Sequence, residues 1–229
     1  MLVLAMVACG GSAAPAAPAA PRQIAAPLEP VRVLYPQASP QLVPYWLAAD
    51  AGLFARNGLN ADFQQLPVDD AFARLLAGDV DVYLTPLTPA LVGRVADGAD
   101  LVILGGTPQL AIVVTRRLLG TREVVLERFL RGALEGIHAA SAQPERARDL
   151  LAREGQFASA DQADAAVRAY LAASPERVPY LGASDVEPVL ATRAGEDPRA
   201  ADLQPERLLE PALLRRLEAS GFVASLYRA

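Results

Sequence analysis

Polar side chains that could hold a small ligand follow the β-rich runs of this chain. They share a place just past the end of such a run, and they are Gln37, Ser39, Gln41, Asp69, Thr85 and Thr88. Amide and hydroxyl groups donate and accept hydrogen bonds, and the amides of a helix N-terminus suit an anion. Tyr45 and Trp46 could add a flat aromatic wall, unless one of them belongs to the core. Together these residues predict a binding site for a small solute.

The sequence offers no set of residues that supports catalysis. Nucleophilic catalysis by Ser or Cys needs a histidine within reach, and the only histidine, His138, follows the apolar Ile137 in a segment with helical spacing. We expect His138 to pack or to meet solvent at the edge of that helix. The glycine pairs at 10–11 and 105–106 lack the spacing of a phosphate-binding loop, and the chain has no lysine. We therefore expect that the protein is not an enzyme.

Composition excludes several other classes of function. The chain has 229 residues, of which 52% are hydrophobic, so it can bury a sizeable core in one or two domains. Its net charge of −5 is spread along the chain without a basic block, which argues against nucleic acid as a partner. A single Cys and a single His exclude internal disulfides and His/Cys metal sites. We expect no metal and no cofactor.

Two pairs of aspartates have simpler explanations than catalysis. Asp69 and Asp70 are adjacent, so their carboxylates seldom face one another, and capping of the helix that follows explains them best. Asp69 is kept as a candidate ligand contact because it follows a β-rich run. Asp79 and Asp81 alternate at the beginning of a strand and are most simply solvated.

The elements that must position these residues alternate between strand and helix. Four β-rich runs lie at 31–35, 61–66, 79–84 and 101–104, and helical segments begin near 42, 69 and 89. This alternation predicts a mostly parallel sheet with helices on both faces. Gly58 and Gly78 stand where helices must stop with positive φ. Such sheets bind ligands outside the carboxyl ends of their strands, which here are 36–41, 67–70 and 85–88.

The first thirty residues differ in composition from the rest. Residues 1–8 are apolar, and the segment MVACGG at 6–11 resembles the end of a bacterial lipoprotein signal, whose Cys becomes lipidated. We expect 1–9 to be a signal remnant with lipidation at Cys9, although the apolar stretch is short and lacks a positive n-region. The alternative is an apolar fragment with an incidental Cys. Residues 10–30 are rich in Ala and Pro, as a tether between a membrane anchor and a folded domain would be.

Four segments carry a resemblance to a known family. They are YWLAADAGLFARNGL at 45–59, LAGDVDV at 76–82, GADLVILGG at 98–106 and LEASGFV at 217–223. They resemble the solute-binding proteins of ABC importers of the nitrate/sulfonate/taurine and thiamine-pyrimidine-precursor type. The resemblance implies a three-layer α-β-α lobe of periplasmic-binding-protein type II, with a mostly parallel sheet and one antiparallel returning strand. It also implies ABC permease subunits as partners, and a location in the periplasm or on the outer face of the cytoplasmic membrane.

After Gly106 the chain departs from that family, whose second lobe is inserted at this point. Here 107–110 leads directly into 111–117, which resembles the returning strand. A second lobe of roughly 100 residues, by the usual size of domains, is therefore expected to be absent. A gene-model error or a degraded gene would give the same pattern. We expect 31–229 to form a single lobe, in which 31–106 is the α/β block and 111–229 holds the returning strand, antiparallel to its neighbours, and the C-terminal helices.

The C-terminal half is predicted to be helical. Helices are expected at 125–137, 144–155, 161–171 and from Pro205 through Leu217, with a loop at 175–180 and a left-handed cap at Gly221.

We expect the protein to be the substrate-binding component of an ABC importer for nitrate, a sulfonate or taurine, or a thiamine pyrimidine precursor. We expect this function to be impaired by loss of the second lobe. A non-binding remnant or interaction domain is the main alternative, and an enzyme resembling thiamine-pyrimidine synthases is a weaker one. One lobe would leave Tyr45 or Trp46 partly in water and limit the affinity to the order of millimolar.

Overall fold

A single five-stranded sheet forms the centre of the computed structural model, which describes residues 27–154, 158–173 and 176–228. The strands are β1 (Glu29–Tyr35), β2 (Leu59–Gln65), β3 (Val82–Thr85), β4 (Leu101–Thr107) and β5 (Leu110–Thr115), in the order β2-β1-β3-β5-β4. Strand β1 pairs in parallel with β2 and β3, whereas β5 runs antiparallel to both β3 and β4. Val113 of β5 is paired with Tyr83 on one side and Ile103 on the other, which confirms the predicted antiparallel returning strand.

Strands β4 and β5 are joined by a tight turn at 108–109. The last pair of the ladder is Thr107 with Leu110, and the register shifts between Ile103 and Gly105. Gly106 has a φ of 125°, and a Cβ there would lie 2.2 Å from the carbonyl oxygen of Leu110. Only glycine fits that close approach, so this residue shapes the end of the hairpin.

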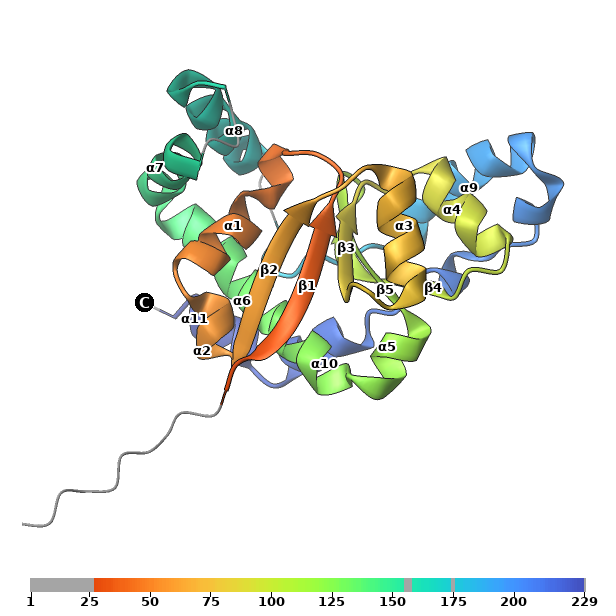
Figure 1. The fold of residues 1–229 in the computed structure, drawn as a ribbon, viewed down its shortest axis with the longest axis horizontal. Coiled ribbons are helices and arrows are strands. Elements are labelled where there is room, and N and C mark those ends of the chain that lie inside the picture. Colours follow the sequence, from red (N-terminus) through yellow and green to blue (C-terminus); the bar gives the residue numbers. More distant parts are fainter. Residues whose placement is uncertain (1–26, 155–157, 174–175, 229) are drawn as a thin grey trace, which may run out of the picture.

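Helices cover both faces of the sheet, so the fold has the three layers that the sequence predicts (Figure 1). On one face lie α1 (Val43–Asp50), α2 (Leu53–Arg56), α6 (Glu123–Ala142) and α10 (Ala212–Ala219). On the other lie α3 (Val68–Ala77), α4 (Pro89–Ala96) and α9 (Ala183–Glu196). The remaining helices are α5 (Arg116–Thr121), α7 (Pro144–Glu154), α8 (Ala160–Ala172) and α11 (Phe222–Leu226), with 3-10 turns at η1 (Pro40–Leu42), η2 (Pro198–Ala200) and η3 (Pro205–Arg207).

The alternation of side chains along each strand divides the core into two clusters. Val31 and Val33 of β1 pack with α1, α2 and α6, whereas Leu34 faces α3 and α4. Strand β4 alternates in the same way, with Leu104 on the first side and Ile103 on the second. Burying each such side chain contributes about 1.5–3 kcal/mol. Because both faces are apolar, the sheet is stable only when both helical layers are present.

Asp69 and Asp70 do not cap α3, which corrects the expectation drawn from the sequence. The helix begins one residue earlier, at Val68, and its N-cap residue is Pro67. The side chain of a proline cannot cap a helix, so no side-chain hydrogen bond caps this one. Pro67 has extended backbone angles that lead directly into the first turn. The two aspartates lie within that turn, where their charges favour the positive end of the helix dipole.

Asp81 is buried rather than solvated, which is a second correction. Only 2% of it is exposed, and its carboxylate accepts hydrogen bonds from the backbone N of Arg32 at 2.8 Å and from Arg122 Nη1 at 2.6 Å. Arg122 also bonds Glu29 at 3.0 Å. Buried charges persist only when they are paired in this way. The amino-terminal side of the sheet is therefore held by an ion network, which we call the Asp81 network.

The C-terminal helices differ from the prediction in two places. The long helix expected from Pro205 is wrong, because η3 is followed by a bridge in which Leu209 pairs with Ile103 of β4, and α10 begins only after Pro211. Helix α9 was not predicted from the sequence at all. The left-handed conformation at Gly221 is confirmed, with a φ of 79°.

The N-terminal predictions lie largely outside the described residues. The signal remnant at 1–9, the lipidation at Cys9 and most of the tether at 10–30 stay predictions. Within the ranges that the structure describes, no helix is both long and apolar enough to span a membrane.

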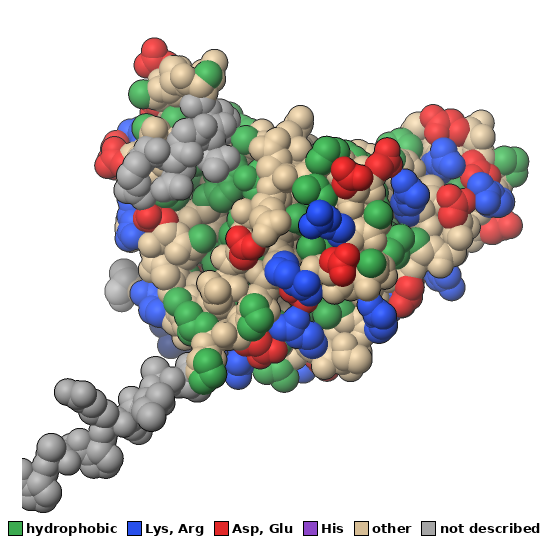
Figure 2. All heavy atoms as spheres, viewed as in Figure 1, with side chains coloured by type: hydrophobic (Ala, Val, Ile, Leu, Met, Phe, Trp, Pro, Cys, Tyr) green, Lys and Arg blue, Asp and Glu red, His purple; other side chains and the backbone are tan. Residues whose placement is uncertain are grey.

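On the face drawn in Figure 2, acidic and basic side chains lie next to each other over α3 and α4.

Candidate functional site

A cavity of about 290 Å³ lies at the carboxyl ends of β1 and β4. Its lining comes from η1, from the β4–β5 turn, from the end of α8 and from the segment 176–185. A smaller recess of about 50 Å³ adjoins it and reaches the side chains of Tyr45, Leu110 and Ile137. Gln41, Thr107, Tyr170 and Glu176 line both spaces. We call this combined space the crevice, and it lies where the topology predicts a ligand site.

Backbone contacts fix the outer wall of the crevice against the sheet. The amide of Gly106 donates to the carbonyl oxygen of Pro179 at 2.8 Å. A Cβ on the neighbouring Gly105 would lie 2.8 Å from that same oxygen, so glycine permits the approach. Tyr180 donates its hydroxyl to Glu218 of α10 at 2.9 Å, and burial together with this bond raises the pKa of Tyr180 to about 12. The segment that carries Glu176 is thereby held at both β4 and α10.

Two buried tyrosines form the inner part of the crevice. Tyr170 is 6% exposed, and its hydroxyl has no hydrogen-bond partner among the described residues. Burial raises the pKa of Tyr170, and the neighbouring Tyr45 and Tyr227 raise it further, so the hydroxyl stays protonated. Tyr45 stacks on Phe129 with ring centroids 6.4 Å apart, and burial raises its pKa as well. A buried hydroxyl without a partner costs about 1–3 kcal/mol, and this one belongs to the lining of the crevice.

Three backbone donors around the crevice are already used within the protein. In addition to the Gly106 amide, the amide of Leu110 donates to Thr107 Oγ1 at 3.2 Å, and that of Gly182 donates to the carboxylate of Asp185 at 2.9 Å. The charged side chains in the lining are Glu176 and Asp185. Beside the neutral side-chain amides of Gln41 and Gln109, the crevice therefore presents acceptors and negative charge.

Two of the eight predicted ligand contacts, Gln41 and Tyr45, lie together in the crevice. Trp46 is 8% exposed and lies instead in a separate cavity of about 230 Å³, with its ring edge-on to Tyr35 at 5.9 Å. The expectation that Tyr45 or Trp46 would lie partly in water is wrong. Helix α8 and its Tyr170 cover Tyr45, so C-terminal helices shield this end of the sheet.

The other five predicted contacts are placed outside the crevice lining. Thr88 caps α4, since its Oγ1 accepts from the amide of Leu91 at 3.4 Å. Thr85 is 3% exposed at the end of β3, and Asp69 pairs with Arg94 at 2.9 Å on the surface of α3 and α4. Gln37 is exposed and Ser39 is half-buried before η1. A ligand role for these residues stays a prediction.

Sequence reasoning missed the residues that the C-terminal part contributes. Tyr170 was assigned to the apolar face of a helix and Glu176 to a loop, and both assignments are correct locally. Nothing in their spacing places them beside Gln41, because only the packing of α8 against η1 brings them together. The signal that could have pointed to them is a tyrosine on an otherwise small and apolar helix face.

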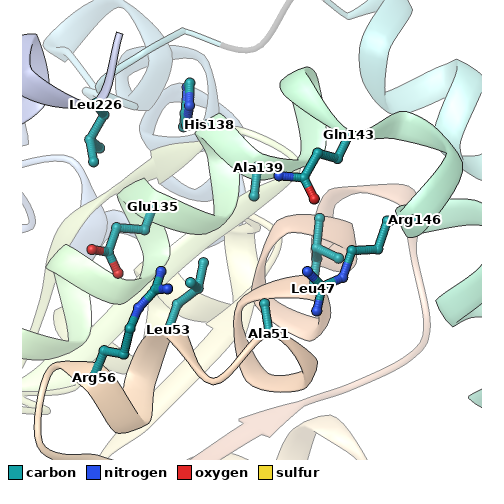
Figure 3. A pocket seen from close by; sticks show the side chains of 10 residues that line it. All are labelled: Leu47, Ala51, Leu53, Arg56, Glu135, His138, Ala139, Gln143, Arg146 and Leu226. Atoms are coloured by element: carbon teal, nitrogen blue, oxygen red, sulfur yellow. The ribbon is translucent and has the colours of Figure 1, made fainter. Parts of the chain in front are cut away.

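The only histidine lies in a different cavity, of about 210 Å³, among α1, α2 and α6 (Figure 3). His138 is half-buried, and its ring lies edge-on to Tyr227 at 4.6 Å, which confirms the predicted packing. The charged residues of this lining are Glu135, Arg56 and Arg146, and Glu135 accepts from Asn57 at 2.9 Å. No Ser, Thr or Cys is part of this described lining, so His138 has no nucleophile to activate there.

Several solved structures resemble this chain. One is the ligand-binding component of an ABC-type import system from Staphylococcus aureus with zinc bound, with a TM-score of 0.60 and 8% identity over 82% of this chain and 98% of that one. A Candida albicans protein with the generic periplasmic binding protein fold has a TM-score of 0.61 and 11% identity over 84% and 95%. The alkanesulfonate-binding protein SsuA from Xanthomonas axonopodis pv. citri, bound to MOPS, has a TM-score of 0.53 and 13% identity over 82% and 99%.

At these identities the likeness establishes the fold, which is that of periplasmic binding proteins. No protein-family model matches the chain. No curated protein matches it either.

Proposed function

We propose that this protein is the solute-binding component of an ABC importer, related to the sulfonate-binding and thiamine-precursor-binding proteins. The observation that carries the proposal is the crevice, which lies at the carboxyl ends of the strands. It contains the hydroxyl of Tyr170, which has no hydrogen-bond partner within residues 27–154, 158–173 and 176–228. Structural neighbours that bind solutes for import support it. The ligand is a small solute, and ABC permease subunits are the partners.

We also propose that the second lobe is absent, so that the crevice forms a single binding wall. The direct turn from β4 to β5 at 108–109 and the single sheet within the described residues support this. A pocket in a two-lobed protein buries about 70–90% of its ligand, and one lobe supplies only part of that contact. Two or three hydrogen bonds of about 0.5–1.5 kcal/mol each, less the entropy of association, give a dissociation constant on the order of millimolar.

Amide chemical shifts measured by NMR test this proposal, because they detect millimolar binding and locate it. The solutes to titrate are taurine, an alkanesulfonate, nitrate and an aminopyrimidine, each at a concentration near 10 mM, on the order of the expected dissociation constant. We expect the sizes of the amide shifts to differ between these solutes. At least one of them should move the signals of Gln41, Gly106 and Thr107 while leaving the surface residue Asp69 unchanged. A micromolar complex would contradict the single-lobe account, and the absence of any crevice shift would contradict the binding function.

The main alternative is a remnant that no longer binds a solute, or an interaction domain. It predicts no localised shift with any solute. An enzyme is disfavoured because His138 lies in a cavity without a nucleophile, and the structural neighbours are mainly binding proteins. A thiamine-pyrimidine synthase-like activity would require His and Cys chemistry that this crevice does not contain.

Cys9 defines the proposed attachment to the membrane. If it is lipidated, the protein lies in the periplasm on the outer face of the cytoplasmic membrane, held by the tether at 10–30. Several acyl chains give stable anchoring, whereas one gives only marginal binding. We expect the protein to sediment with membranes in its native host and Cys9→Ala to release it. Recovery of the unaltered protein wholly in the soluble fraction would contradict the anchor.

A further inference from the structure

The crevice differs in charge from a site built for nitrate or a sulfonate. Its lining contains the carboxylates of Glu176 and Asp185 and no arginine, and the chain has no lysine. Arg177, the next residue after Glu176, holds its guanidinium 4.4 Å from the ring centroid of Tyr227, which lies outside the lining. An anion in this space would meet like charge, and no cation of the lining would offset it.

Three of the backbone amides at the crevice are not free to replace the missing cation. Anion sites without Arg or Lys rely on free amides at helix N-termini and tight turns. Here the amides of Gly106, Leu110 and Gly182 each donate to an oxygen of the protein itself. The carboxylate of Asp185 occupies the N-terminus of α9, where an anionic ligand would otherwise bind.

Acceptors, aromatic faces and the neutral side-chain amides of Gln41 and Gln109 are what this space offers a ligand. Glu176 makes no hydrogen bond or ion pair with any residue in the described ranges, so its carboxylate is available. The hydroxyl of Tyr170 is unpartnered and can accept a hydrogen bond, and the rings of Tyr170 and Tyr45 can face a cation. These groups come from α8, from the 176–185 segment and from α1, and they meet only in the folded protein.

We infer that the crevice selects a solute with a protonated nitrogen, such as a primary amine or amidine on a flat ring, and rejects anions. This inference rests on the proposed binding function and narrows its ligand class. The ammonium or amidinium group lies against Glu176 and the Tyr170 hydroxyl, and the ring enters the apolar recess beside Tyr45. A volume of about 290 Å³ limits the ligand to a small monocyclic molecule.

Three probes of nearly equal size and different charge test the inference: benzylamine as the cation, benzyl alcohol as the neutral form and phenylmethanesulfonate as the anion. We follow the amide signals of Gly106 and Thr107 during titration of the full chain. We expect benzylamine to bind at least about fivefold more tightly than benzyl alcohol, since a charge pair at 4 Å in water is worth about 1 kcal/mol. The anion should bind more weakly than both.

Two variants separate the charge effect from a change in folding. Glu176→Gln keeps the shape of the side chain and should reduce the preference for benzylamine to about twofold or less, given the same charge-pair estimate. Glu187→Gln, on the exposed part of α9 and outside the lining, should leave the preference unchanged. Equal affinity for the three probes, stronger binding of the sulfonate, or an unchanged preference in Glu176→Gln would overturn the inference while leaving solute binding intact. If no probe shifts the crevice signals, the proposed function itself fails.

Discussion

At the amino end of the sheet, the buried carboxylate of Asp81 accepts hydrogen bonds from both Arg32 and Arg122. At the carboxyl end, by contrast, the buried hydroxyl of Tyr170 has no partner in the part of the chain that the structure describes. Both groups are removed from water to a similar degree, with 2% and 6% exposed. Pairing a buried charge stabilises the fold, and leaving a buried hydroxyl unpaired costs free energy. Under the proposed function, one end of the sheet serves stability and the other keeps hydrogen-bonding capacity for a ligand.

Removing Asp81 should have the largest effect on stability. Asp81→Ala loses the bonds to the Arg32 amide and to Arg122 and leaves the amide without its acceptor. The arginine side chains are 46% and 27% exposed, so water solvates part of the charge that is left. We expect the free energy of unfolding to fall by roughly 2–4 kcal/mol. Urea denaturation measures it, and a loss below about 1 kcal/mol would show that the network is not structural.

The second largest loss of stability should come from Gly106→Ala, which strains the backbone beside the crevice. Gly106→Ala forces a side chain into positive φ and against the Leu110 carbonyl, so we expect a loss of roughly 2–3 kcal/mol. Gly98→Ala is the matched control, because Gly98 has a φ of 93° but nothing within 4 Å of an added Cβ. The control should lose only about 1 kcal/mol. Equal losses measured by thermal denaturation would show that the close approach at the β4–β5 turn is not limiting.

Removing the hydroxyl of Tyr170 should change the free energy of unfolding in the opposite direction. Tyr170→Phe removes a buried polar group without a partner and keeps the ring, so the free energy of unfolding should stay the same or rise by up to about 1 kcal/mol. The same variant should weaken binding of benzylamine in the NMR titration. A clear loss of stability would mean that the hydroxyl already has a hydrogen-bond partner, and the contrast between the two ends of the sheet would disappear.

The exposed ion pair between Asp69 and Arg94 should have the smallest effect. The carboxylate of Asp69 is 88% exposed, and such pairs contribute about 0–1 kcal/mol. We expect Asp69→Asn to change the free energy of unfolding by less than about 0.5 kcal/mol and to leave the crevice shifts as they are. A loss of solute binding in this variant would return Asp69 to the ligand site.

The α/β block was predictable because each of its elements has a local signature. Short β-rich runs indicate the strands, and Gly58 and Gly78 adopt the positive φ that their positions require. The Asp81 network was not predictable, since Arg32 and Arg122 are 49 and 41 residues away in the sequence. Helix α9 was missed because Pro188 lies inside it, and a proline normally argues against a helix. The crevice depends on similar long-range packing, so only Gln41 and Tyr45 were found in advance.

The turn at 108–109 has a consequence for protein engineering. Thr107 and Leu110 are paired across it, so the chain leaves the sheet and returns to it at nearly the same point. Both turn residues, Pro108 and Gln109, are exposed. An added domain whose own termini lie close together could be spliced in here without moving any strand, as at other exposed loop tips. The hairpin is thus a natural acceptor for a grafted lobe, and such a chimera would convert an open surface into a closing clamp.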